Sequence, residues 1–250
     1  MAEPVLRTHG LSRTFGGLAA VSDVSLECHA GRLHAVIGPN GAGKTTLINL
    51  LSGDLAPSAG RIEILGHDVS RLAAHRISQL GVGRSYQRTN VFMRFTAFEN
   101  CRLAAQSRLA NSMRFVRSAA SYRAVNEAAA NALALAELAG REESTAADLS
   151  HGERRQLEVA MTLATNPKVL LLDEPLAGMG AEESARMVEL LRKLIPAHAT
   201  LLVEHDMDAV FSLAHTLTVM VDGRILASGP PAEVRANDAV QKAYLGDADD

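Results

Sequence analysis

Residues 38–45 of the 250-residue chain read Gly38-Pro39-Asn40-Gly41-Ala42-Gly43-Lys44-Thr45, and this stretch decides the fold. It matches the pattern G-x-x-x-x-G-K-[ST] at every fixed position, between an apolar strand pattern and a helical pattern. Glycines let successive backbone N–H groups surround a phosphate, and the helix N-terminus adds roughly half a positive charge. We therefore predict a loop that binds a nucleoside triphosphate and ends at Thr46. Lys44 is expected to reach the β- and γ-phosphates, and the Thr45 hydroxyl to bind Mg²⁺.

The second informative stretch begins with an apolar run at 169–172, and this run predicts a strand buried on both faces. Asp173 and Glu174 come directly after it, at the edge of a parallel sheet where ligands bind. Asp173 is expected to hold Mg²⁺ through water. Glu174 is expected to orient and deprotonate the attacking water, a role typically worth about 10²–10⁴ in rate. Taken alone, the pair could equally be a solvated turn before Pro175.

Alternating strand and helix patterns predict an α/β fold with a mostly parallel sheet covered on both faces. The expected strands are 5–8, 24–28, 33–37, 61–65, 169–172 and 201–203, with a hairpin of 216–221 and 224–227. The expected helices are 45–52, 111–139 and 182–195. A helical stretch interrupts this order, which suggests three segments. They are 1–87, an antiparallel β subdomain with the first part of the core; 88–158, an inserted helical subdomain; and 159–250, the rest of the core with the C-terminal tail.

Composition excludes several classes of function. Apolar residues make up 47% of the chain, enough for a packed core, and the net charge of −3 gives no electrostatic case for nucleic-acid binding. Two cysteines without short spacing do not predict a metal site or a disulfide framework. The N-terminus lacks the pattern of a signal peptide, and no apolar run reaches the ~18–20 residues of a membrane-spanning helix. At a membrane, the protein would have to dock onto another protein.

Three further segments resemble the ATPases of ABC transporters. Leu149-Ser150-His151-Gly152-Glu153 resembles their LSGGQ signature, Gln87 their Q-loop glutamine, and His205 their switch histidine. All occur in the order of the family, and the resemblance covers essentially the whole chain. It implies a phosphate-loop (RecA-like) ABC ATPase core with a small antiparallel β subdomain and an inserted α-helical subdomain.

The resemblance also implies roles for these residues. Ser150 and Gly152 would bind the ATP held by a partner subunit, and Gln87 would assist catalysis and Mg²⁺ binding. His205 would contact the γ-phosphate. Phe15 matches the aromatic position that stacks on adenine, although a small core aromatic is the alternative. Ser150 should also cap the following helix, with Glu153 completing a capping box.

Four segments are similar to the ATP-binding subunits of branched-chain amino acid importers. They are Phe15–Val21 with Asp23–Ser25, Asp173–Met179, Val203–Met207 and Lys242–Gly246. This resemblance implies ATP and Mg²⁺ as ligands, permease subunits and a second ATPase subunit as partners, and indirectly a solute-binding protein. The second subunit could be identical or related. The chain would lie peripherally at the cytoplasmic face of the inner membrane, with the permease helices near 88–99.

The sequence departs from the family at three places, since His151 and Glu153 alter the signature and the D-loop at 176–180 lacks its usual aspartate. Other functions also stay open. They are import of another solute such as urea, an ABC ATPase outside transport, a phosphate-loop enzyme of another class, and a nucleotide-binding regulator without turnover. An N-K-x-D guanine motif is missing, which disfavours a GTPase.

Overall fold

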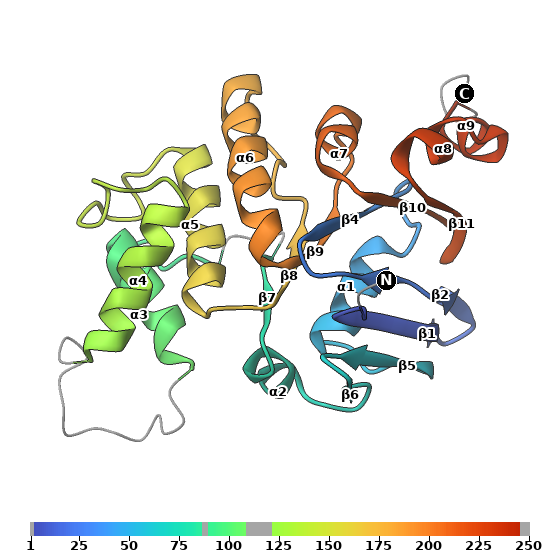
Figure 1. Ribbon diagram of the computed structural model, residues 1–250, viewed down its shortest axis with the longest axis horizontal. Helices are drawn as coiled ribbons and strands as arrows, with labels where there is room; N and C mark the ends of the chain where they lie inside the picture. Colours follow the sequence, from blue (N-terminus) through green and yellow to red (C-terminus); the bar gives the residue numbers. More distant parts are fainter. Residues whose placement is uncertain (1–2, 87–89, 109–121, 246–250) are drawn as a thin grey trace. The chain divides into compact units, whose positions relative to one another are not determined.

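The computed structural model describes residues 3–86, 90–108 and 122–245 (Figure 1). The chain forms two compact units and crosses between them four times. One unit comprises Met1–Val82, Lys168–Glu174 and Leu194–Asp250, and the other comprises Gly83–Pro167 and Pro175–Lys193. Among the described residues, none of the helices combines the length and the apolar character that crossing a membrane requires.

A six-stranded sheet carries the phosphate loop and the acidic strand end. Its order is β11-β10-β4-β9-β8-β7, in which β10, β4, β9 and β8 run parallel and β11 pairs antiparallel with β10. The bounds are β4 (Arg32–Ile37), β7 (Val82–Arg84), β8 (Val169–Asp173), β9 (Ala199–Val203), β10 (Thr216–Val221) and β11 (Arg224–Gly229). All residues of β8 and β9 are buried, as their apolar sequences predict for central parallel strands.

A smaller antiparallel sheet has the order β2-β1-β5-β6, with β3 also paired to β1. Its strands are β1 (Leu6–Phe15), β2 (Leu18–Val24), β3 (Glu27–Cys28), β5 (Ala59–Ile64) and β6 (His67–Asp68). The helix α1 (Lys44–Ser52) contributes Leu47, Ile48 and Leu51 to a core cluster that also contains side chains of both sheets. The predicted α/β fold is thus confirmed, and α1 ends as expected at Gly53, which has a φ of 78°.

The predicted strand at 24–28 is wrong, because the structure divides it into the end of β2 and the separate β3. Asp23 has a φ of 55°, which bends the chain before Val24. The buried Thr8 hydroxyl then donates to Val24 O (3.0 Å) and accepts from Leu26 N (2.9 Å). A side chain therefore takes the place of ladder hydrogen bonds at this point. The strand predicted at 5–8 is also too short, since β1 continues past Gly10 to Phe15 through register shifts.

The second unit is built around α3 (Ala97–Gln106), α4 (Arg123–Leu135), α5 (His151–Ala164) and α6 (Ala181–Leu194). Of the helix predicted at 111–139, residues 109–121 lie outside the described part of the chain. The described part of this helix, α4, ends at Leu135, four residues before the predicted end at 139. It ends there because Glu137 adopts a left-handed φ of 61° and Leu138 N donates back to Leu133 O (2.9 Å). The expected apolar face is confirmed by the buried Val125, Ala129 and Leu133.

Shorter helices complete the described chain. They are α2 (Ala74–Gln79), the 3₁₀ turn Ile195–Ala197, α7 (Met207–Leu213), α8 (Pro231–Arg235) and α9 (Asp238–Leu245). The helix predicted at 182–195 is α6, and it gives way to the 3₁₀ turn just before Pro196, which cannot continue the backbone ladder of a helix.

Candidate functional site

The phosphate loop connects β4 to α1, and two of its glycines are required by close backbone approach. A Cβ at Gly38 would lie 2.2 Å from Met220 O, and a Cβ at Gly43 would lie 2.2 Å from Ala20 O. Gly43 also has a φ of 95°. No side chain fits at either position without moving the neighbouring backbone, so the glycine pattern found in the sequence has a direct steric cause.

The turn between β10 and β11 holds this loop in place. Gly223 N donates to Ala42 O (3.1 Å), and Gly223 O accepts from Ser22 N (2.8 Å). The turn therefore ties the phosphate loop to β2. Sequence reasoning identified Asp222-Gly223 only as a hairpin turn, because nothing in its composition indicates the distant loop that it supports.

The N-terminus of α1 is suited to an anion. Its N-cap residue is Gly43, which has no side chain to cap the helix, and its first turn contains no acidic residue. The Lys44 ammonium donates to Gly38 O (2.6 Å) and Pro39 O (3.0 Å), and Lys44 is only 8% exposed. Uncapped N–H groups beside a held ammonium create positive potential at the loop.

The end of β8 brings its carboxylates towards Lys44. Asp173 is buried, and Glu174 has a left-handed φ of 49° and donates its N–H to Val203 O (2.9 Å). Burial lowers the pKa of Lys44, and the negative charges of Glu174 and Asp173 oppose that shift. The structure thus brings together the lysine of the phosphate loop and the two acidic residues singled out from the sequence.

The end of β9 presents His205 next to a buried carboxylate. The His205 side chain is 65% exposed, whereas Glu204 is fully buried and accepts the His205 N–H at 3.0 Å. The Glu204 carboxylate also lies 3.7 Å from His205 Nδ1. No motif of the sequence singled out Glu204, although it is a charged residue directly after an apolar strand, the same signal that identified Asp173.

Phe15 ends β1 and is 44% exposed, so it is not a core aromatic. The Arg13 guanidinium lies 4.7 Å from the centre of its ring and donates to Ala56 O (2.8 Å). A cation therefore supports this exposed ring, at the position where the family resemblance places an adenine.

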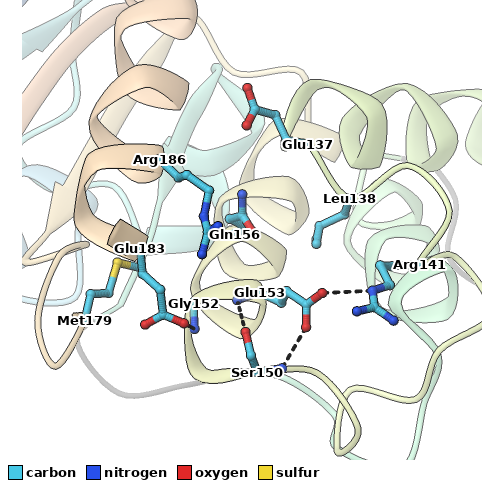
Figure 2. A pocket seen from close by; sticks show the side chains of 10 residues that line it. All are labelled: Glu137, Leu138, Arg141, Ser150, Gly152, Glu153, Gln156, Met179, Glu183 and Arg186. Carbon is cyan, nitrogen blue, oxygen red and sulfur yellow. Dashed lines mark hydrogen bonds and ion pairs between the residues drawn. The ribbon is translucent and has the colours of Figure 1, made fainter. Parts of the chain in front are cut away.

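The signature segment belongs to the second unit and begins α5. Ser150 is the N-cap, its hydroxyl accepts from Glu153 N (3.1 Å), and Ser150 N donates to the Glu153 carboxylate (2.8 Å). The expected capping box is confirmed. Arg141 also donates to the Glu153 carboxylate at 2.8 Å (Figure 2).

Gly152 is buried within this segment, and its N–H donates to the Glu183 carboxylate at 3.1 Å (Figure 2). A pocket of about 390 Å³ surrounds the contact. Its lining residues are Glu137, Leu138, Arg141, Ser150, Gly152, Glu153, Gln156, Met179, Glu183 and Arg186. The distance of 31 residues between Gly152 and Glu183 explains why no sequence pattern revealed the contact.

The candidate residues thus belong to two groups. The loop 38–46, Asp173, Glu174, His205 and Phe15 lie in the first unit, and Ser150 and Gly152 lie in the second. Gln87 lies outside the described residues.

A family model described as "ABC transporter" matches residues 21–177, and the chain therefore belongs to the ABC transporter family. A second model, described as "Branched-chain amino acid ATP-binding cassette transporter", matches residues 224–250. The chain is an ABC ATPase that binds nucleotide, as the resemblance implied.

Individual relatives align along their whole lengths. BraF of Pseudomonas aeruginosa, a high-affinity branched-chain amino acid transport ATP-binding protein, is 39% identical and covers 99% of this chain and 100% of its own. LivG of Escherichia coli, with the same description, is 36% identical at the same coverage. A solved ATP-binding cassette of an ABC transporter in its ADP conformation is 27% identical, with a TM-score of 0.87 over 98% of this chain and 100% of that chain.

Proposed function

We propose that this chain is the ATP-hydrolysing subunit of an importer for branched-chain amino acids. The observation that carries the proposal is full-length similarity, at 36–39% identity, to ATP-binding proteins described for that transport. The match of residues 224–250 to the corresponding family model supports the same solute class in a part of the chain outside the phosphate-loop motifs. Urea or a short amide is the alternative solute.

The geometry of the phosphate loop supports ATP as the substrate. A loop whose glycines admit no Cβ, followed by a helix without a side-chain cap, fits a triphosphate whose oxygens accept backbone N–H groups. Residues 38–46 would hold the phosphates. Lys44 would exchange its two carbonyl acceptors for phosphate oxygens, and Phe15 would stack on the adenine.

The same region supports Mg²⁺ as a cofactor. Thr45 and Asp173 would hold the ion, with Gln87 as a further ligand, and phosphate oxygens and water would complete the six ligands that Mg²⁺ prefers. When bound, Mg²⁺ would neutralise charge that develops on the phosphates during hydrolysis.

Glu174 and His205 would carry the reaction. Glu174 would orient the attacking water and accept its proton, and the hydrogen bond from its N–H to Val203 O fixes the backbone from which it acts. His205 would contact the γ-phosphate, with its backbone held by the buried Glu204. The role of Glu174 requires it near the phosphates, which agrees with its electrostatic influence on Lys44.

Ser150 and Gly152 would complete the site of a second ATPase subunit, so that two ATP molecules lie between two chains arranged head to tail. The second chain would be an identical or a related one. The exposed Phe92, Met93 and Phe95, two of which stack with ring centres 5.4 Å apart, would contact permease subunits. Through these subunits the chain would act with a solute-binding protein and lie peripherally at the cytoplasmic face of the inner membrane.

Replacement of Glu174 by Gln tests the hydrolytic site. This change removes the proton acceptor while preserving shape, so the rate of phosphate release should fall by about 10²–10⁴. The variant should also accumulate as an ATP-bound dimer on a sizing column with ATP and Mg²⁺. Glu174→Gln combined with Lys44→Ala is the control and should stay monomeric because it cannot hold the triphosphate.

A Glu174→Gln chain that stays monomeric at high protein concentration would contradict the homodimer and direct attention to a related ATPase as partner. Uptake of labelled leucine and of labelled urea by cells expressing the complete transporter, with wild-type or Glu174→Gln chains, tests the solute. Loss of urea uptake with unaffected leucine uptake would reject the amino acid assignment.

A further inference from the structure

The contact between Glu183 and Gly152 uses a group that the proposed function assigns to ATP. Ser150 and His151 are exposed at the start of α5, but Gly152 is buried, and its N–H is bound to the Glu183 carboxylate at 3.1 Å. The absence of a side chain at position 152 permits this approach, because a Cβ there would lie 2.6 Å from the same carboxylate oxygen.

The Glu183 carboxylate lies at the first turns of two helices. Glu183 belongs to the first turn of α6, and its carboxylate reaches the first turn of α5 as well. The N-termini of both helices carry positive partial charge, so both favour an anion at this point. The carboxylate is therefore held where a phosphate oxygen would be bound in the composite site.

We propose that Glu183 is a built-in competitor of the terminal phosphate of ATP at the signature segment. A phosphate oxygen can bind the Gly152 N–H only after the Glu183 carboxylate has left it. Two like charges cannot share one donor without strong repulsion at a few ångströms. The inference rests on the proposed composite site and adds to it a residue that sets the ATP concentration needed for closure.

The surrounding pocket offers the displaced side chain a new position. Its volume of about 390 Å³ exceeds the needs of one carboxylate, and Arg186 projects into it from α6 one turn after Glu183 (Figure 2). Arg186 is paired with Glu182 at 2.9 Å in this structure. Release of Glu183 would therefore bring it beside an existing cation, which keeps the charge paired during the exchange.

Glu183→Gln and Glu183→Ala, each placed in the Glu174→Gln chain, test this competition. The amide of glutamine can still accept the Gly152 N–H but carries no charge. The ATP concentration for half-maximal dimer formation, measured by analytical ultracentrifugation with Mg²⁺, should fall roughly tenfold in both variants. The affinity of the monomer for ADP, which lacks the terminal phosphate, should not change. Glu189→Gln, which alters an exposed carboxylate further along α6 that pairs with Arg192 and does not line the pocket, is the matched control and should leave the ATP requirement as it is.

A second measurement separates the contact from dimer formation. Hydrogen exchange of the Gly152 amide in the nucleotide-free full chain should be faster in Glu183→Ala than in the Glu189→Gln control. Equal exchange, or an ATP requirement that is unchanged or higher in the Glu183 variants, would overturn the inference while leaving the ATPase proposal intact. Failure of the Glu174→Gln parent to dimerise at any ATP concentration would instead reject a composite site between identical chains, and with it the inference for that site.

Discussion

Gly41 and Gly43 lie two residues apart in the phosphate loop, and both have left-handed backbones, with φ of 82° and 95°. Their surroundings differ. A Cβ at Gly41 would have no atom within 4 Å, whereas a Cβ at Gly43 would lie 2.2 Å from Ala20 O. The two positions therefore separate the cost of backbone conformation from the cost of a steric clash.

Gly41→Ala should lower the free energy of unfolding by about 1–2 kcal/mol, the cost of a left-handed L-residue. Gly43→Ala adds the clash with a backbone carbonyl that belongs to β2, so its loss should exceed that of Gly41→Ala by at least ~2 kcal/mol. Urea denaturation of the nucleotide-free variants measures both values. Equal losses would mean that β2 moves away from the loop at little cost.

Among the secondary-structure elements, α5 has a start that serves two purposes. The capping box of Ser150 and Glu153 stabilises the helix, and the same residues occupy the signature segment. The hydrogen bond from Ser150 N is the main cause that lowers the pKa of Glu153, and it favours the anionic carboxylate at the helix N-terminus. The glutamate that departs from the family signature is thus fully compatible with the local structure.

Ser150→Ala should reduce the free energy of unfolding by about 1 kcal/mol, because the Glu153 N–H loses its acceptor. Glu153→Gln retains the capping box but removes the charge, and with it the partly exposed pair with Arg141 and the attraction to the helix N-terminus, so its effect should stay within about 0.5–1 kcal/mol. Thermal or urea unfolding of the matched pair measures the difference. A larger loss in Glu153→Gln than in Ser150→Ala would show that the charge of Glu153, not the Ser150 cap, holds this end of α5.

Elements whose stability is local could be predicted from the sequence. The alternation of glycine, strand and helix signals located α1, β8 and the capping box, because each depends on residues close together in the chain. The strand at 24–28 was mispredicted because its break depends on Thr8, 16 to 18 residues away. The contact of Glu183 with Gly152 and the hydrogen bond from Gly223 to the phosphate loop could not be predicted for the same reason, since both join distant segments. The segment boundaries at 87 and 158 stay a prediction, as does the role of Gln87.

At the scale of the whole molecule, the candidate residues of the phosphate loop belong to one unit and those of the signature segment to the other. If one chain contributes the phosphate loop and another the signature, the two regions should respond to ATP under different conditions. Binding to a single chain should protect only the first unit, whereas dimer formation should protect both.

Hydrogen exchange with mass spectrometry can detect this division. In wild-type chain diluted to favour the monomer, ATP with Mg²⁺ should slow exchange in peptides covering 38–46 but not in those covering 150–156. In the concentrated Glu174→Gln chain both regions should become protected. Removal of Mg²⁺ by a chelator should abolish the second response. Protection of 150–156 in the monomer would contradict a site completed by a second chain.

The hydrogen bond between Gly223 and the phosphate loop also has a consequence for biosynthesis. Ala42 accepts its hydrogen bond from a residue that the ribosome adds about 180 residues later, which takes roughly ten to thirty-five seconds at ~5–20 residues per second. During that interval the nascent chain contains the complete glycine-rich motif without the turn that holds it. We therefore expect the nascent chain to bind ATP only late in its synthesis, after the turn at Gly223 has been added. Unfinished chains would then hold little ATP.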